Sequence, residues 1–503
     1  MNRESLSPRA YLLLSGLWHT RRGLWRLVLA LATALLLFLG WRAWATLHGP
    51  PLMPWHRYVP AEQSARQIER LDWAGYLAAE QALFERTETW LAAHLPPGAD
   101  VPSNRYAPSS PMQPSRRAVD WNHSYRLAPD GPPHGVVVLL HGLTDSPYSL
   151  RHIARHYQQR GYLALGIRLP GHGTVPGAGP RAQWQGWRAA ARLALRQARL
   201  EVPAPAPLHL VGYSTGGALA LQYALDALED PALAPPQQLV LLSPMIGVTS
   251  LARFAGVLGW PALFPAFDRA AWVEIYPEYN PYKYNSFPVN GARQSSLLTD
   301  ALQQQLQALS ASGRIAALPP LTVFQSLADA TVSTPAVIDG LFTWLPANGS
   351  ELVLLDIDRS AEVDTLLRSD SLSSPAQLLP PAPRAWAASV LSNLGEASGE
   401  LVELHTPAGD LEPTHRTLGL RYPLGVYSLS HIALPFPLSD GLYGLEPDPA
   451  DVPGLALGAL SVRGERGLLW VSQDDLARIK CNPFFDHLLQ RIDRLLQASD
   501  AAP

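Results

Sequence analysis

The chain has 503 residues but only one cysteine, Cys481, so it can form no internal disulfide and must fold without one, even in an oxidising compartment. It also lacks CxxC, HExxH and paired-histidine patterns, a glycine-rich dinucleotide fingerprint and any internal repeat. The formal net charge of −3 is too small to indicate binding to nucleic acid. We therefore expect no metal, no cofactor and no nucleic-acid partner. The oligomeric state stays open.

Charged residues are also sparse, at 16% of the chain against 47% hydrophobic residues. This composition is typical of a globular protein with a large core and excludes a disordered chain. Lysine is nearly absent beside abundant arginine, a bias that we attribute to genomic composition rather than to function.

The most informative segment is residues 208–217, which read LHLVGYSTGG. An apolar run predicts a strand, a sharp turn follows, and an alanine- and leucine-rich helical pattern comes directly after it. A nucleophile in such a turn takes a strained backbone conformation, and only small residues two positions on either side avoid a clash. Gly212 and Gly216 provide that space, so the pattern predicts a nucleophilic hydroxyl on Ser214.

A second motif lies upstream, where residues 135–140 (GVVVLL) predict a buried strand and the loop HGLTDS follows at 141–146. A continuous apolar run of this kind suits a parallel sheet that is covered on both faces. Acyl transfer requires two backbone N–H groups aimed at the developing oxyanion. We expect these groups from Leu143 and Thr215. Either motif alone could be an ordinary glycine turn, but the two in this order favour catalysis.

Together with LPGHG at 169–173, this order of motifs resembles the α/β-hydrolase superfamily, in particular its monoacylglycerol lipase, carboxylesterase and serine aminopeptidase-like branch. The resemblance covers residues 118–357 and resumes near Tyr427. It implies an α/β fold, with a mostly parallel sheet and helices on both faces, and a serine nucleophile. It does not specify the substrate.

The resemblance also implies the chain order nucleophile, acid, histidine. Asp329 follows the predicted strand 321–327 and matches the acid position, although an N-cap for the predicted helix 335–345 would also explain it. Asp356 and Asp358 are competing carboxylates. They end the next predicted strand and therefore come one strand too late.

For the base, the resemblance favours His431, which lies in YSLSHIALPF, a pattern that indicates a strand end running into a loop. A serine hydroxyl needs such a base, and Asp329 would hold the correct tautomer of the ring. His405 and His415 precede a further strand-like run and are the alternatives.

Two insertions are expected in this fold. Residues 246–320 are rich in aromatic residues and proline, and they predict either a lid over Ser214 that fits an apolar acyl group or a plain packing layer. The 102 residues that separate Asp329 from His431 are too many for one helix and one strand. Residues 358–425 therefore predict a second insertion, with short additional strands at 401–405 and 418–422.

The N-terminal region predicts a membrane segment. Residues 27–41 carry no charge, and if the flanking Arg26 and Arg42 extend to the interfaces, the usable span covers residues 24–47, enough to cross a bilayer. Arg21, Arg22 and Arg26 precede the apolar core, so the positive-inside rule predicts a cytoplasmic N-terminus and a catalytic body on the outer, periplasmic side. A signal peptide cleaved near residues 43–45 is the alternative.

The predicted organisation is a basic cytoplasmic segment at 1–23, a membrane anchor at 24–47, a helical extension and proline- and serine-rich linker at 48–117, and an α/β-hydrolase domain at 118–503. We predict a serine hydrolase that cleaves an ester or related acyl bond of a small-molecule or lipid substrate. Peptidase, thioesterase and acyltransferase activities use the same residues and stay open. A catalytically silent lipid-binding or envelope-scaffolding module is a further alternative, although it would not need all three site residues.

Overall fold

The computed structural model describes residues 8–247, 265–360, 375–394, 399–451, 455–460 and 477–500. The chain divides into two compact units, one formed by Met1–Pro51 and Leu258–Ala271, the other by Leu52–Val257 and Trp272–Pro503. The first seven residues of the predicted cytoplasmic segment lie outside the described residues. So do residues 248–264 of the predicted lid and residues 361–374 and 395–398 of the predicted second insertion.

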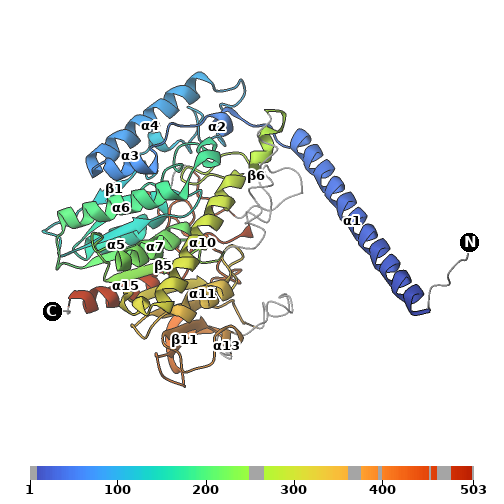
Figure 1. Cartoon of the computed structure of the whole chain (residues 1–503). Helices are drawn as coiled ribbons and strands as arrows, with labels where there is room; N and C mark the ends of the chain where they lie inside the picture. The colour runs from blue at the N-terminus through green and yellow to red at the C-terminus, as the bar shows by residue number, and fades with distance from the viewer. Residues whose placement is uncertain are drawn as a thin grey trace, which may run out of the picture. The chain divides into compact units, whose positions relative to one another are not determined.

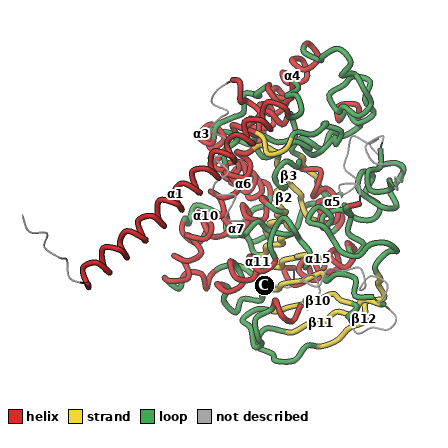
Figure 2. The backbone as a smooth tube through the Cα atoms, turned by 90° about the vertical axis from the view of Figure 1, so that its right-hand side faces the viewer, coloured by secondary structure: helices red, strands yellow, loops and turns green. Residues whose placement is uncertain are grey.

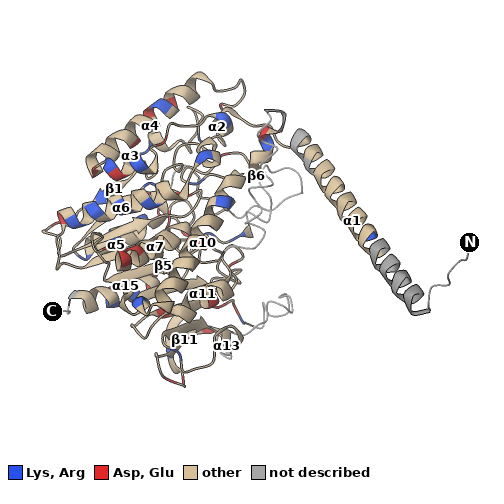
Figure 3. Cartoon of the chain, in the orientation of Figure 1, with Lys and Arg blue, Asp and Glu red and all other residues tan. Residues whose placement is uncertain are grey.

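The first unit contains the long helix α1 (Pro8–His48) and the short 3-10 helix η5 (Pro265–Ala271). Within α1, Gly23–Trp41 has a mean hydropathy of 2.0 and is not buried by other parts of the protein. This stretch carries one charged residue, Arg26 near its start, and Figure 3 shows the part of α1 that follows it free of charged residues up to Trp41. Among the described residues, one helix, at the N-terminus, is therefore long and apolar enough to span a membrane, a property that a signal sequence shares.

The second unit is built on a ten-stranded sheet with the order β1-β3-β2-β4-β5-β8-β9-β10-β11-β12 (Figure 1). The strands from β3 to β10 in this order run parallel to one another, whereas β1, β11 and β12 pair antiparallel at the two ends. The strands are β1 (Tyr125–Leu127), β2 (Gly135–Leu140), β3 (Tyr162–Ile167), β4 (Leu208–Tyr213), β5 (Gln238–Leu242), β8 (Leu321–Ser326), β9 (Glu351–Leu355), β10 (Ala387–Ser392), β11 (Glu400–Thr406) and β12 (Thr414–Arg421). A separate pair joins β6 (Trp272–Glu274) to β7 (Phe287–Pro288).

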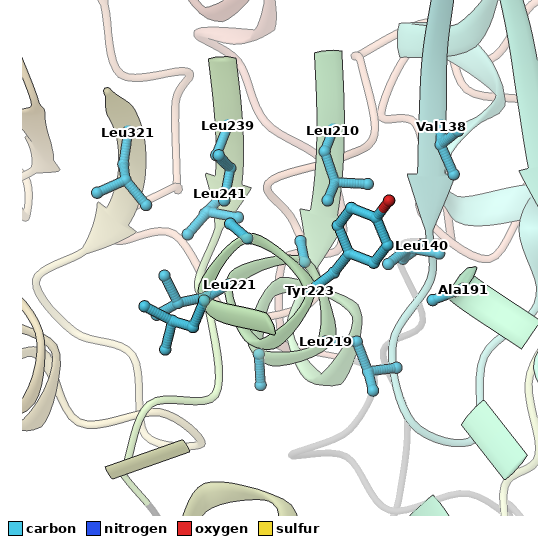
Figure 4. Close-up of a cluster of buried hydrophobic side chains, with 14 of the residues drawn as sticks. Val138, Leu140, Ala191, Leu210, Leu219, Leu221, Tyr223, Leu239, Leu241 and Leu321 are labelled. Atoms are coloured by element: carbon cyan, nitrogen blue, oxygen red, sulfur yellow. The ribbon is translucent and has the colours of Figure 1, made fainter. Parts of the chain in front are cut away.

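Helices cover both faces of this sheet, as the apolar strands predict. On β2, Val136 and Val138 belong to one apolar cluster while Val137 and Leu139 belong to another, so every residue of the strand is buried. Figure 4 shows Leu221 and Tyr223 of one helix on the side that faces the leucines of β4 and β5. The described helices are α2 (Pro54–Arg57), α3 (Ala65–Arg70), α4 (Trp73–Ala93), α5 (Arg151–Gln159), α6 (Trp184–Glu201), α7 (Thr215–Glu229), α10 (Val289–Ala311), α11 (Thr334–Gly340), α13 (Pro375–Leu378) and α15 (Phe485–Asp500).

A buried arginine fixes the N-terminal helices to this core. The guanidinium of Arg168, just after β3, lies 2.9 Å from a carboxylate oxygen of Glu62 and 3.1 Å from one of Glu80 on α4. The Arg168 and Glu80 side chains are almost fully buried, and Glu80 also accepts hydrogen bonds from the amide and hydroxyl of Ser124. Removing one partner of such a pair leaves an uncompensated charge in the interior, so the extension is part of the folded core.

The region predicted as a second insertion extends the sheet (Figure 2). Strands β11 and β12 occupy the segments where additional strands were expected, and β10 is a strand that the sequence analysis did not predict. The sequence of β10, AASVLS, contains few of the β-branched and aromatic residues that favour strands, so pairing with β9 determines its conformation.

After β12 the chain returns across the ends of the parallel strands. The Asp358 amide donates to the Tyr427 carbonyl at 2.8 Å, and the Ser326 hydroxyl donates to the Leu429 carbonyl at 2.7 Å. Residues 427–436 form turns and irregular structure, so the expectation that His431 follows a strand end was wrong. Contacts with β8 and β9, rather than a strand of its own, position this segment.

Candidate active site

Ser214 occupies the sharp turn between β4 and α7. Its backbone has φ 53° and ψ −116°, a conformation that residues other than glycine adopt only under strain. The turn is held because the Ser214 amide donates to the Leu242 carbonyl at 2.9 Å and the Ser214 carbonyl accepts from the Gly217 amide at 2.9 Å. Ser214 is 8% exposed, so its hydroxyl lies in a pocket rather than on the open surface.

The two predicted glycines are required by close backbone contacts. A Cβ atom at Gly216 would lie 1.9 Å from the Leu140 carbonyl oxygen, and one at Gly212 would lie 2.4 Å from the Gly216 carbonyl oxygen. Neither distance is possible without a shift of the backbone. The sequence GYSTG therefore allows α7 to begin directly beside the end of β2.

His431 joins Ser214 to Asp329 by hydrogen bonds. Its Nε2 lies 3.0 Å from the Ser214 Oγ, and its Nδ1 lies 2.8 Å from the Asp329 Oδ2. The other oxygen of Asp329 accepts from the amides of Thr331 and Val332 at 2.8 and 2.9 Å. The structure thus brings together the three residues that the sequence analysis selected.

The environment of Asp329 favours its ionised form. Burial alone would raise the pKa of this carboxyl, but the hydrogen bond and charge of His431 and the two amide donors outweigh it and lower the pKa. An ionised Asp329 accepts a hydrogen bond from Nδ1 of His431. The ring then carries its acceptor nitrogen, Nε2, toward the Ser214 hydroxyl.

The competing carboxylates are engaged at the end of β9. Asp356 pairs with the guanidinium of Arg359 at 2.8 Å and accepts from the Ser392 hydroxyl at 2.6 Å. Asp358 accepts from the Asn393 side-chain amide at 2.8 Å. These bonds join the segment that follows β9 to the end of β10.

The competing histidines lie on the added strands. His405 Nδ1 is 2.8 Å from the Ser389 hydroxyl and 3.5 Å from Glu351, and His415 is exposed on β12. Neither makes a hydrogen bond to Ser214 or Asp329 within the described residues.

The loop after β2 carries Leu143, the expected upstream oxyanion donor. The His141 ring fixes this loop, because Nε2 accepts from the Leu169 amide at 3.0 Å and Nδ1 therefore donates to the Gly142 carbonyl at 2.8 Å. Burial lowers the pKa of His141 well below its ordinary value, so the ring stays neutral. The amides of Leu143 and Thr215 have no hydrogen-bond acceptor within the described residues, and both residues line the pocket of Ser214.

The pocket at Ser214 has a volume of about 590 Å³. Part of the region predicted as a lid forms its wall, including Val273 and Tyr276, whereas Leu298 and Leu302 of α10 are buried in the core. One part of residues 246–320 therefore walls the pocket and another part packs in the core, and the lid itself stays a prediction. The pocket is also lined by three cationic residues that no sequence motif predicted, Lys283, Arg478 and Lys480.

One group of described residues, His152, Asp440 and Asp451, has the spacing of a possible metal site. However, Arg151 already occupies it. One guanidinium nitrogen lies 2.7 Å from Asp440, and the other contacts Asp451. The arrangement is thus a buried ion-pair network, with His152 Nε2 3.0 Å from Asp440.

Comparisons with known proteins find similarity over part of the chain. Residues 131–342 match the family model described as Serine aminopeptidase, S33. No curated protein matches the chain. Among solved structures, one of the metagenome-derived lipolytic enzymes LipS and LipT is 21% identical with a TM-score of 0.37, covering 51% of this chain and 95% of that one. A monoglyceride lipase from Saccharomyces cerevisiae is 14% identical with a TM-score of 0.36, covering 46% and 82%.

Proposed function

We propose that this chain, an α/β-hydrolase by its sheet and its family match, is a membrane-anchored serine hydrolase that cleaves carboxylic esters. The predicted fold, a mostly parallel sheet with helices on both faces, is confirmed, and so is the resemblance to this superfamily. The hydrogen-bonded series Ser214, His431 and Asp329 supports the proposed chemistry most strongly.

In the proposed reaction, the Ser214 oxygen attacks the ester carbonyl while His431 Nε2 takes its proton. The imidazolium that forms is stabilised by the Asp329 carboxylate, which stays ionised. His431 then gives the proton to the leaving alcohol, and an acyl group remains on Ser214. Water, activated by the same histidine, releases the acid and restores the serine.

The amides of Leu143 and Thr215 would hold the oxyanion of each tetrahedral intermediate. Both residues line the pocket beside Ser214, and their N–H groups have no other acceptor among the described residues. Because a hydrogen bond to a charged oxygen is stronger than one to a neutral carbonyl, these amides would stabilise the transition state more than the substrate.

The pocket favours an ester over the amino terminus of a peptide. An aminopeptidase must bind a positively charged amino group, which needs a nearby carboxylate. Among the described pocket residues, the single carboxylate, Glu274, is outnumbered by three cationic side chains. Apolar wall residues such as Val273, Phe287 and Ile432 fit an acyl chain instead.

We further propose that α1 anchors the protein in a membrane, with residues 1–23 in the cytoplasm, residues 48–117 as the helical extension and linker, and the hydrolase domain at 118–503 on the outer side. The apolar stretch Gly23–Trp41 and the arginines that precede it support this orientation. In bacterial cells that express the chain, protease added to spheroplasts should then digest the hydrolase domain. Protection of the domain would reverse the orientation, and a mature N-terminus near Thr46 would indicate a cleaved signal peptide.

The chemistry is tested by labelling the detergent-solubilised full chain with a fluorophosphonate probe. Wild type should be labelled at Ser214 and should hydrolyse 4-nitrophenyl esters, whereas Ser214→Ala should lose both activities and keep its thermal unfolding temperature. Ser312→Ala, an exposed serine at the end of α10, is the matched control. An unlabelled wild-type protein would favour the lipid-binding or scaffolding alternative, and a screen of amides, thioesters and esters would separate the hydrolase classes.

A further inference from the structure

The pocket of Ser214 has a cationic wall that the proposed ester hydrolysis does not use. We define this cationic wall as Lys283, Arg478 and Lys480. Lys283 comes from the segment between β6 and β7, and the other two residues come from the segment that leads into α15. Glu274 is the carboxylate that lines the same pocket among the described residues, and it is exposed. The described lining of this pocket therefore has more basic side chains than acidic ones.

The use of lysine makes this placement informative. The chain has 39 basic residues, of which only Lys283 and Lys480 are lysines. A compositional bias that replaces lysine by arginine throughout the sequence leaves lysine at two positions, and both line one pocket. Unlike the planar guanidinium of arginine, the lysine ammonium is a compact charge on a flexible chain. It can therefore reorient toward a ligand within a narrow pocket.

Lys283 is held beside the expected oxyanion loop. Its carbonyl accepts from the guanidinium of Arg105 at 3.4 Å, and the next amide, that of Tyr284, donates to the Thr144 carbonyl at 2.8 Å. The side chain is half-buried, and its ammonium makes no hydrogen bond or ion pair within the described residues. Burial lowers the pKa of Lys283, the charge of Asp145 opposes this shift, and that of Arg478 adds to it.

Arg478 lies near the acid of the catalytic series. One nitrogen of its guanidinium is 3.4 Å from the hydroxyl of Thr331, two residues after Asp329. The side chain is exposed, so its other donors remain accessible to a ligand. Lys283 and Arg478 repel each other electrostatically, and an anion bound between them would remove this repulsion.

We propose that the cationic wall is a subsite for an oxyanion, a carboxylate or a phosphate, that the ester substrate itself carries. The substrates would then be anionic amphiphiles, with the acyl chain against the apolar residues and the charged group against Lys283 and Arg478. Charge-assisted hydrogen bonds from lysine and arginine to such oxygens are among the strongest that side chains make. This inference rests on the proposed ester hydrolysis.

Two matched substrate pairs test it on the solubilised full chain. The first compares the 4-nitrophenyl half-ester of glutarate with its neutral methyl ester, which places the charge on the acyl side. The second compares a monoacylglycerol phosphate with the same monoacylglycerol, which places the charge on the alcohol side. We expect wild type to prefer the anionic member of at least one pair in kcat/KM, by about tenfold at low salt, with the preference falling as salt screens the charges.

Lys283→Met and Arg478→Gln should each reduce the ratio of anionic to neutral kcat/KM by about tenfold. Arg86→Gln, which removes an exposed charge from α4, should leave the ratio unchanged. Arg478 is exposed, so its variant keeps the test valid if Lys283→Met does not fold.

Two results would overturn the subsite while leaving ester hydrolysis intact. One is wild-type hydrolysis of the neutral esters with no preference for either anion, and the other is an anion preference that both variants retain. Failure to hydrolyse any ester, together with no fluorophosphonate labelling, would instead remove the proposed function and the subsite with it.

Discussion

Replacing Asp329 by asparagine should inactivate the enzyme through the tautomer of His431. In the native protein, Asp329 Oδ1 accepts from the amides of Thr331 and Val332, and Oδ2 faces His431 Nδ1 at 2.8 Å. In Asp329→Asn, the amide oxygen must keep the two backbone donors, so its NH₂ group points at Nδ1. The histidine then accepts at Nδ1 and carries its proton on Nε2, where it cannot act as a base for Ser214.

The expected loss in kcat is about ten-thousandfold, as for a base held in the wrong tautomer, or about 5.5 kcal/mol of transition-state stabilisation. The fold should change little, because the two backbone hydrogen bonds of the side chain remain. The assay is initial-rate hydrolysis of 4-nitrophenyl butyrate, with thermal unfolding measured on the same samples.

Asp356→Asn is the matched control, because it neutralises the competing buried carboxylate at the end of the next strand. This variant loses its ion pair with Arg359 and should unfold at a lower temperature, yet it should keep most of its activity. If Asp329→Asn retained more than a tenth of the wild-type kcat, or if Asp356→Asn were the inactive variant, the assignment of the acid would be refuted.

Three further predictions concern other parts of the fold. His431→Ala should reduce kcat by orders of magnitude while His405→Ala stays near wild type in the same assay, and the reverse result would move the base into the added strands. Asp440→Asn should lower the free energy of unfolding by about 3–5 kcal/mol in denaturant titrations, because it removes the fully buried carboxylate that pairs with the buried Arg151; a change under 1 kcal/mol would contradict this. Burial lowers the pKa of His209 to about 3 in the folded protein, below its value of about 6.5 in the unfolded chain. The unfolded chain therefore binds a proton first as the pH falls below 6.5. This lowers the free energy of unfolding by about 2 kcal/mol at pH 5. The unfolding temperature of His209→Gln should therefore fall less between pH 7 and pH 5 than that of wild type, and equal slopes would show that His209 is not the titrating group.

Local patterns made the nucleophile turn predictable. The requirement for Gly212 and Gly216 arises within a few residues of Ser214, where backbone atoms of neighbouring elements meet. The same holds for β2, whose six consecutive apolar residues are buried on both faces of the sheet. Features of this kind depend on short-range sterics and burial, which a sequence expresses directly.

The approach to His431 depends on distant contacts and was predicted less well. A strand end was expected, but the chain reaches His431 from β12, at the edge of the sheet, through irregular structure that is bonded to β8 and β9. The unpredicted strand β10 likewise forms by pairing with β9. The cationic wall is formed by two segments almost two hundred residues apart, so no local pattern predicts it. The scarcity of lysine was the sequence signal that could have identified its residues.

The buried ion pairs of Arg168 set the size of the smallest piece of this protein that can be produced alone. The family match begins at residue 131 and ends at residue 342, whereas Glu62 and Glu80, the partners of Arg168, precede it and His431 follows it. A fragment cut to the recognised segment would keep an arginine in its interior without a counter-charge, at a cost of about 3–5 kcal/mol, a large share of a typical domain's stability. A water-soluble version should therefore start between the end of α1 and Glu62, and it should retain α15.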